Sequence, residues 1–193
     1  MVNQTIASII QSYEYHQPSP QPALSFQIPE AKELMTQILE YKLGSKFQWL
    51  KEYDNIVKWL NNNEGKGLLC MGNCGRGKTL ICRDIIPPII KYKCERVIST
   101  NTMQQAAKNL DELLEKKLIG LDDVGTECIS VRYGERRIPF AELVDNAERN
   151  NGLLIITTNL TAAELAEKYG ERTLDRLKVL TKLVHFEGES LRG

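Results

Sequence analysis

Apolar residues along this chain follow two arrangements that alternate. Short runs that are almost wholly apolar, such as Gly67–Met71, are typical of strands buried on both faces of a parallel sheet. Between these runs lie longer segments in which apolar residues recur every three or four positions, as on a helix with one buried face. From residue 65 onward the two patterns alternate, which predicts strands joined by helical crossovers.

The same patterns place the individual elements. Residues 29–42 are predicted to form a helix with proline at its start, and the helix that begins at Thr79 should end or kink at Pro87 and Pro88. The spacing of Thr161 and Glu164 is that of a capping box at the start of another helix. The predicted strands are 67–71, 96–100, 118–121, 153–157 and 183–186, and the other predicted helices are 54–60, 103–116, 140–150 and 171–180.

These elements predict a three-layer α/β/α domain around a five-stranded parallel sheet. Residues 1–28 are interpreted as a flexible leader, because the run QPSPQP at 17–22 favours extended or disordered chain. A single folded domain then covers 29–193, with N-terminal helices over 29–64 and the core over 65–193. No C-terminal lid domain is expected.

The turn after the first core strand, residues 72–79, reads GNCGRGKT and carries the strongest chemical signal. Its glycines permit a tight turn whose backbone N–H groups surround phosphate, and the helix that follows adds its N-terminal dipole. Lys78 would reach the β- and γ-phosphates of a nucleoside triphosphate. The alternative, a glycine-rich turn before an ordinary helix, fits the strand–loop–helix context less well. The expected nucleotide-binding residues are Gly72, Asn73, Cys74, Gly75, Arg76, Gly77, Lys78, Thr79 and Leu80.

A second signal is the run LIGLDDVG at 118–125, in which two acids follow a buried strand. Ligands of open α/β sheets bind at the carboxyl ends of the strands. Asp122 would hold Mg²⁺ together with the Thr79 hydroxyl, and Asp123 would orient or polarise the attacking water. The alternative is a strand that ends in an Asx turn.

Two further motifs follow the acidic pair. In LLIITTNL, Asn159 ends a strand at the same edge, where its amide can contact the γ-phosphate or the water; helix capping is the alternative, although Thr161 suits that role better. In YGERTLDRL, Arg172 and Arg176 share one helix face. An arginine offered across an interface can stabilise transition-state charge, whereas spacing alone favours an ordinary solvated pair.

Composition limits the binding partners and the cellular location that the sequence allows. The chain has 193 residues, 25 basic and 25 acidic, and zero net charge argues against strong sequence-independent binding of nucleic acid by one isolated copy. Five cysteines without Cys-x-x-Cys spacing fit a reducing, cytoplasmic location. No apolar run approaches the ~18 residues of a membrane span, so no membrane partner is expected.

Together GNCGRGKT, LIGLDDVG, IITTNL, YGERTLDRL and the closing FEGESLR resemble the AAA+ ATPases, more narrowly the bacterial helicase-loader and transposition-helper (DnaC/IstB-like) branch. The resemblance covers residues 67–192. It implies ATP and Mg²⁺ as cofactors, Asp123 as catalytic acid, Asn159 as first sensor, and an arginine finger at Arg176 first and Arg172 second. It also implies a homo-oligomer with shared active sites that engages a replicative helicase or single-stranded DNA.

The sequence departs from that branch in two ways. The leader has neither the length nor the cysteine and histidine ligands of a helicase-binding domain, and between the second strand and Asp122 there is room for only one helix. A transposition helper that engages a transposase therefore stays open as an alternative, as does a small metabolite or nucleotide kinase. A non-catalytic nucleotide switch is disfavoured because both acids of the Asp122–Asp123 pair are present.

Overall fold

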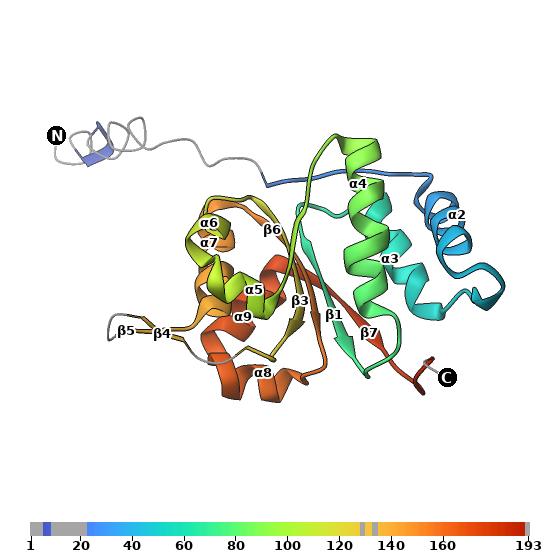
Figure 1. Cartoon of the computed structure of the whole chain (residues 1–193). Helices are drawn as coiled ribbons and strands as arrows, with labels where there is room; N and C mark the ends of the chain where they lie inside the picture. The colour runs from blue at the N-terminus through green and yellow to red at the C-terminus, as the bar shows by residue number, and fades with distance from the viewer. Residues whose placement is uncertain (1–5, 9–22, 128–129, 133–134, 192–193) are drawn as a thin grey trace.

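The chain forms a parallel sheet covered by helices on both faces (Figure 1). The computed structural model describes residues 6–8, 23–127, 130–132 and 135–191. Within these residues the main sheet has five strands, and every neighbouring pair is parallel. The predicted three-layer α/β/α architecture is confirmed.

The order of the strands brings three loops together. The sheet runs β2-β3-β6-β1-β7, so β6 lies between β1 and β3. Because all strands are parallel, the loops that follow β1, β3 and β6 leave the sheet at one edge. The strand bounds are Gly67–Gly72 for β1, Ser99–Thr102 for β2, Leu118–Val124 for β3, Leu153–Thr158 for β6 and Thr181–Phe186 for β7.

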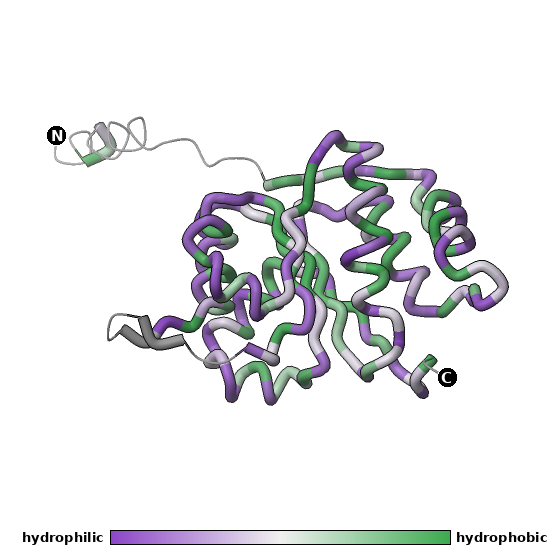
Figure 2. The backbone as a smooth tube through the Cα atoms, viewed as in Figure 1, coloured by the Kyte–Doolittle hydropathy of each residue, from purple (hydrophilic) through white to green (hydrophobic). Residues whose placement is uncertain are grey.

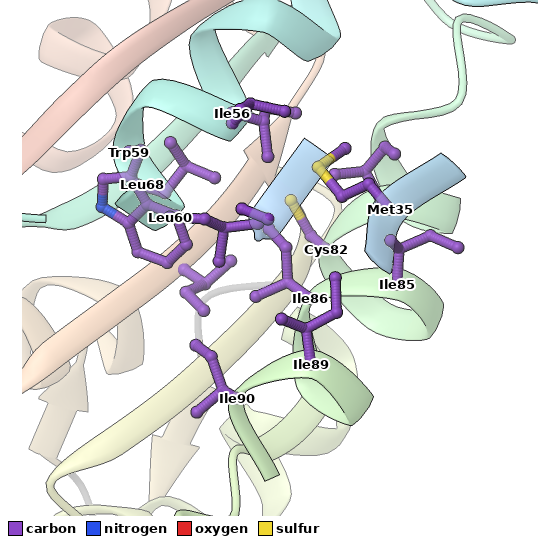
Figure 3. Close-up of a cluster of buried hydrophobic side chains, with 14 of the residues drawn as sticks. Met35, Ile56, Trp59, Leu60, Leu68, Cys82, Ile85, Ile86, Ile89 and Ile90 are labelled. Carbon is purple, nitrogen blue, oxygen red and sulfur yellow. The ribbon is translucent and has the colours of Figure 1, made fainter. Parts of the chain in front are cut away.

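Alternate residues of β1 enter two different cores. Leu68 and Cys70 join the core under α2, α3 and α4, and Leu69 and Met71 join the core on the opposite face. Figure 3 shows the first core, in which Trp59 and Ile86 are among the large side chains that are fully buried. The hydrophobic segments of the tube in Figure 2 accordingly converge on the sheet from both sides. The covering helices of this face are α2 (Ala31–Leu43), α3 (Lys51–Asn61) and α4 (Ile86–Cys94).

The second face is covered by later helices. Leu121 and Ile156 of the sheet pack there against helix residues such as Phe140 and Leu177. The helices are α5 (Met103–Lys108), α6 (Leu110–Leu113), α7 (Pro139–Asn150), α8 (Ala162–Tyr169) and α9 (Glu171–Leu180). The predicted capping box at the start of α8 is confirmed, since Thr161 Oγ1 accepts from the Glu164 N–H and the Glu164 side chain accepts from the Thr161 N–H.

Several predicted boundaries need correction. The second strand starts at Ser99 and not at residue 96, because only residues from Ser99 onward pair with β3, while Val97 is exposed. The single helix predicted over 103–116 is two short helices separated at Asn109.

The prolines after the phosphate loop do not end the helix. Residues Leu80–Ile85 (η2) form a π-helix that leads directly into α4, and Pro87 and Pro88 occupy the first turn of α4. Proline is tolerated in this turn because its fixed φ suits the start of an α-helix.

Two other features differ from the prediction. A hairpin of β4 (Ser130–Arg132) and β5 (Glu135–Arg137) follows β3, and the sequence pattern did not reveal it. The packed chain also begins before residue 29, because Phe26 and Ile28 are buried and Asn63 bonds to the backbone of Phe26 and Leu24. The predicted leader over 1–28 therefore ends earlier, and its residues 1–5 and 9–22 lie outside the described part of the chain.

A short 3-10 helix, η1 (Gly44–Lys46), joins α2 to the segment before α3. Across the ranges given above, none of the helices has the length and apolar character needed to cross a bilayer.

Candidate nucleotide-binding site

Residues 72–79, the phosphate loop, connect β1 to the helix η2 that follows. Gly75 and Gly77 have positive φ angles of 79° and 85°, which residues with a Cβ rarely adopt. A Cβ on Gly75 would also lie 2.2 Å from the Ser190 Oγ. The backbone therefore favours glycine at both positions; of the two, only Gly77 belongs to the phosphate-loop pattern, and Gly75 lies among its free positions.

Lys78 lies under the phosphate loop and is only 5% exposed. Its ammonium donates to the carbonyl oxygens of Gly72 and Asn73 and to Asn159 Oδ1, each at 2.8 Å. Burial lowers the pKa of Lys78, although nearby acidic groups, among them Asp123, act in the opposite direction. The predicted Lys78 and Asn159 are thus in direct contact, although they are 81 residues apart.

The hydroxyl of Thr79 meets the first acid of the predicted pair. Thr79 Oγ1 donates to Asp122 Oδ1 at 2.9 Å, and Thr157 Oγ1 donates to the same oxygen at 2.6 Å. Asp122 is only 4% exposed, and these two hydroxyls fix its carboxylate. Sequence reasoning identified Thr79 and Asp122, and it did not assign this role to Thr157.

Asp123 is held by its backbone in an unusual conformation. Its φ is 54°, and the pairing of β3 with β6 shifts register between Leu121 and Val124. The Asp123 N–H donates to Thr157 Oγ1 at 2.9 Å. A positive φ at a residue with a side chain is strained and is found at functional sites, where it sets the direction of that side chain. Asp123 borders the cavity described next.

A cavity of about 540 Å³ opens in front of the phosphate loop. Its wall contains the predicted Lys78, Thr79, Asp123 and Asn159. The other lining residues are Leu43, Lys46, Tyr53, Cys74, Gly75, Gly77, Leu80, Arg83, Asp84, Thr126 and Leu191. Leu43, Lys46 and Tyr53 come from the N-terminal helical region, which no motif connects to the site.

The side chain of Arg76 is directed away from this cavity. Its Nη2 donates at 2.9 Å to Oε1 of Glu52, a residue of α3 that is 2% exposed. Burial acts against the Glu52 charge, but hydrogen bonds from Arg76 and from backbone N–H groups outweigh it, so the pKa of Glu52 lies below its ordinary value. Arg76, predicted to bind the nucleotide, therefore contributes to the loop through its backbone while its side chain anchors the loop from behind.

Residues 187–191, the C-terminal tail, also hold the phosphate loop. Asn73 Nδ2 donates to the Gly188 carbonyl at 3.1 Å, and the Leu191 N–H donates to the Gly75 carbonyl at 3.0 Å. The Glu187 N–H donates to Glu52 Oε1 at 3.3 Å. The sequence places this tail more than a hundred residues from the loop, so no local pattern could reveal the contact.

The two arginines of α9 differ in their surroundings. Arg176 binds two carboxylates of α7, those of Asp145 and Glu148, and its side chain is 17% exposed. Arg172 is exposed, and no side chain of the described ranges pairs with it. Neither arginine is part of the cavity wall of its own chain.

The site fits a nucleoside triphosphate with a divalent cation. Positive-φ glycines present backbone N–H groups, and the Lys78 ammonium, which now bonds to loop carbonyls, is placed to exchange them for phosphate oxygens. The adjacent oxygens of Thr79 and Asp122 are ligands that Mg²⁺ prefers. The fold and this arrangement define a P-loop NTPase.

The family follows from comparison with known proteins. The family model described as Novel STAND NTPase 3 matches residues 47–191, and the chain belongs to this family. Comparison with curated protein sequences gives no match.

Solved structures show the same fold at low sequence identity. The DnaC helicase loader is 20% identical, with a TM-score of 0.60 over 75% of this chain and 96% of that one. DnaI is 18% identical, with a TM-score of 0.53 over 92% and 89%. AMPPCP-bound DnaA from Aquifex aeolicus is 16% identical, with a TM-score of 0.54 over 76% of this chain and 52% of that chain. These structures confirm the predicted fold, which this chain shares with the DnaC helicase loader.

Proposed function

We propose that this protein binds ATP with Mg²⁺ and hydrolyses it as an assembly of several copies, acting as an accessory ATPase of DNA replication. The observation that carries the proposal is the joining of three separate motifs at one cavity. Lys78 contacts Asn159, Thr79 contacts Asp122, and Asp123 lies beside them. The loader-like fold supports the replication setting.

The residues divide the work of binding. The N–H groups of residues 72–79 and the Lys78 ammonium bind the phosphates, and the N-terminal end of the following helix favours their negative charge. Thr79 and Asp122 would hold Mg²⁺, which neutralises charge on the phosphate oxygens when it is bound. The hydrogen bond of Lys78 with Asn159 supports the sensor role of Asn159, whose amide would contact the γ-phosphate.

Hydrolysis needs a group that orients water. Asp123 borders the cavity next to the magnesium ligand Asp122, and its strained backbone fixes the direction of its side chain. We assign to Asp123 the task of accepting a proton from the attacking water. Asn159 and Thr126 also border the cavity.

The active site is completed by a second copy in this proposal. Neither arginine of α9 borders the cavity of its own chain, so an arginine of this helix can act only on a neighbour's nucleotide. Arg176 is the first candidate and Arg172 the second. In the single chain Arg176 pairs with Asp145 through Nη1 and with Glu148 through Nε, so a finger at this position would have to exchange at least part of these pairs for a neighbour's phosphate.

The test compares Arg176→Ala with the double variant Asp145→Asn/Glu148→Gln. Both weaken the ion pairs between α9 and α7, but only the first removes the guanidinium. We expect Arg176→Ala to lower kcat by about 10³-fold with little change in ATP affinity, as loss of an arginine finger does. The double variant should keep most of the activity.

Equal losses in the two variants would assign Arg176 a structural role, and a loss confined to Arg172→Ala would transfer the finger to Arg172. If none of the three changes alters hydrolysis, the shared site is wrong.

A helicase and a transposase remain the two candidate partners; co-purification of one of them, together with stimulation by single-stranded DNA, would decide between loader and transposition helper. Phosphoryl transfer to a small acceptor without DNA would instead support a kinase.

A further inference from the structure

Residues 122–127, the acidic loop, are anchored at their C-terminal end by the side chain of Glu127. Glu127 is 7% exposed, and its Oε2 accepts from the Gly125 N–H at 3.0 Å. Its Oε1 accepts from the hydroxyl of Tyr169, the last residue of α8. A buried carboxylate is costly unless it is hydrogen-bonded, so this pairing fixes the loop to α8.

Lys168 strengthens the same attachment. Its ammonium donates to the carbonyl oxygens of Gly125 and Glu127. Gly125 has a φ of 110°, and a Cβ there would lie 2.6 Å from the Leu160 Cδ1. The loop is therefore packed tightly on the segment that leads into α8, and the end of α8 holds it by three polar contacts.

Tyr169 is also joined to the two helices that carry the arginine and its partners. Its ring packs on Phe140 of α7, with centroids 4.6 Å apart. Its carbonyl accepts from Thr173 Oγ1 in the first turn of α9 at 2.9 Å. α7, α8 and α9 lie together on one side of the sheet (Figure 1). One residue thus contacts the acidic loop, α7 and α9.

The acidic loop contains both residues that line the nucleotide cavity and the residue that anchors it to α8. Asp123 and Thr126 border the nucleotide cavity, and Thr126 Oγ1 donates to the Asp123 carbonyl at 2.8 Å. Only four residues after Asp123, Glu127 reaches the residue that precedes Gly170 and the arginine helix α9. The acidic loop is therefore joined, through Tyr169, to the first turn of α9.

We infer that Glu127 and Tyr169 are positioning residues that set the orientation of α9, so that each copy presents its arginine to the neighbouring site according to the state of its own acidic loop. This inference rests on the shared active site proposed above. It names the contact through which one nucleotide site influences the next, and it assigns no chemical step to either residue.

The test uses mixtures of two inactive variants. The acceptor carries Arg176→Ala and keeps an intact nucleotide site, and the donor carries Asp123→Asn and keeps the arginine. In a mixture, hydrolysis occurs where a donor arginine meets an acceptor site. Tyr169→Phe is then added to either variant; it removes one hydroxyl and retains the ring that packs on Phe140.

We expect Tyr169→Phe to lower the restored activity about tenfold when the donor carries it and to have little effect when the acceptor carries it, a size typical of coupling between sites. Nucleotide affinity, measured with a fluorescent ATP analogue, should not change. The matched control is Thr181→Val in the donor, which removes a buried hydroxyl that donates to the Leu177 carbonyl at the other end of α9.

Each other outcome has a definite meaning. A loss that appears only in the acceptor would show that Tyr169 acts on its own Asp123, and it would overturn the inference while leaving the shared site intact. An equal loss with Thr181→Val would reduce Tyr169 to general support of the fold and would also overturn it. A mixture that restores no activity would contradict the shared site itself, and the inference would fail with it.

Discussion

The phosphate loop and the acidic loop lie at the same edge of the sheet, but they are held from behind by different chemistry. A buried ion pair of Arg76 with Glu52 and the backbone of the C-terminal tail hold the phosphate loop. A tyrosine and a lysine at the end of α8 hold the acidic loop. One anchor leads to α3 and the tail, and the other leads to the arginine helix.

This difference indicates that the two anchors have different functions. The first anchor shapes the surface that binds phosphate and belongs to a single copy of the protein. The second links Asp123, to which we assign the orientation of water, to α9, the helix that we propose is presented to a neighbouring copy. We therefore expect damage to the first anchor to change nucleotide affinity and stability, and damage to the second to change turnover in the assembly.

The largest contrast should come from replacing one functional residue on each loop. Lys78→Ala should lower ATP affinity by about 100-fold or more, because a buried ammonium that binds phosphate is lost. Asp123→Asn should leave affinity within about twofold but lower kcat by about 10²- to 10⁴-fold, the usual contribution of a general base. Calorimetric titration and steady-state kinetics separate the two effects. Similar losses of affinity in both variants would contradict this difference in function.

The second effect concerns the anchor of the phosphate loop. Glu52→Ala leaves the Arg76 guanidinium, which is 12% exposed, without its carboxylate and should cost about 3 kcal/mol of stability. ATP affinity should fall as well, because the loop loses its support. The control is Lys51→Ala at the adjacent exposed pair with Glu187, which should change the unfolding midpoint little. A Glu52→Ala variant as stable as the Lys51→Ala control would show that the buried pair of Arg76 and Glu52 does not stabilise the phosphate loop.

A smaller effect is expected at Gly75. Gly75→Ala combines backbone strain of ~1–2 kcal/mol with a clash against Ser190 of the tail. Gly44→Ala is the matched control, because Gly44 also has a positive φ but has no atom within 4 Å of its added Cβ. Gly75→Ala should lower both the melting temperature and ATP affinity more than Gly44→Ala does. Equal effects would mean that the tail does not restrain the loop.

The smallest effect is a dependence on pH. The pKa of Glu52 lies below its ordinary value of 4.5, so its carboxylate contributes stability that is present above pH 4.5 and is lost as the pH falls through the folded-state pKa. The difference in stability between the wild type and Glu52→Gln should therefore be constant near pH 7 and shrink in acid. Urea unfolding at pH 7 and at several values below 4.5 measures it. A difference that grows in acid would contradict the assigned charge.

The sequence was sufficient for parts of the fold and site that depend on local pattern. Strand β1, helix α9 and the contacts among Lys78, Thr79, Asp122 and Asn159 follow from short motifs and from the rule that parallel strands end at one edge. What was missed depends on distant partners. Glu52, the C-terminal tail and the pair of Glu127 with Tyr169 act through contacts between segments separated by 24 to 135 residues.

Element boundaries were missed for a related reason. The run RVIST has strand-like composition, but pairing with β3 begins only at Ser99. In the same way, the apolar spacing over 103–116 does not show that the helix is interrupted at Asn109. Pairing with β3 sets the start of β2, and a single sequence does not contain that information directly.

The most direct measurement of the central claim is the specific ATPase activity of the full chain against its own concentration. If an arginine of one copy completes the site of the next, activity per molecule should rise with concentration and approach a plateau as assemblies form. Arg176→Ala should remain flat and low across the same range. Wild-type activity per molecule that is independent of concentration from the most dilute sample upward would contradict the shared active site.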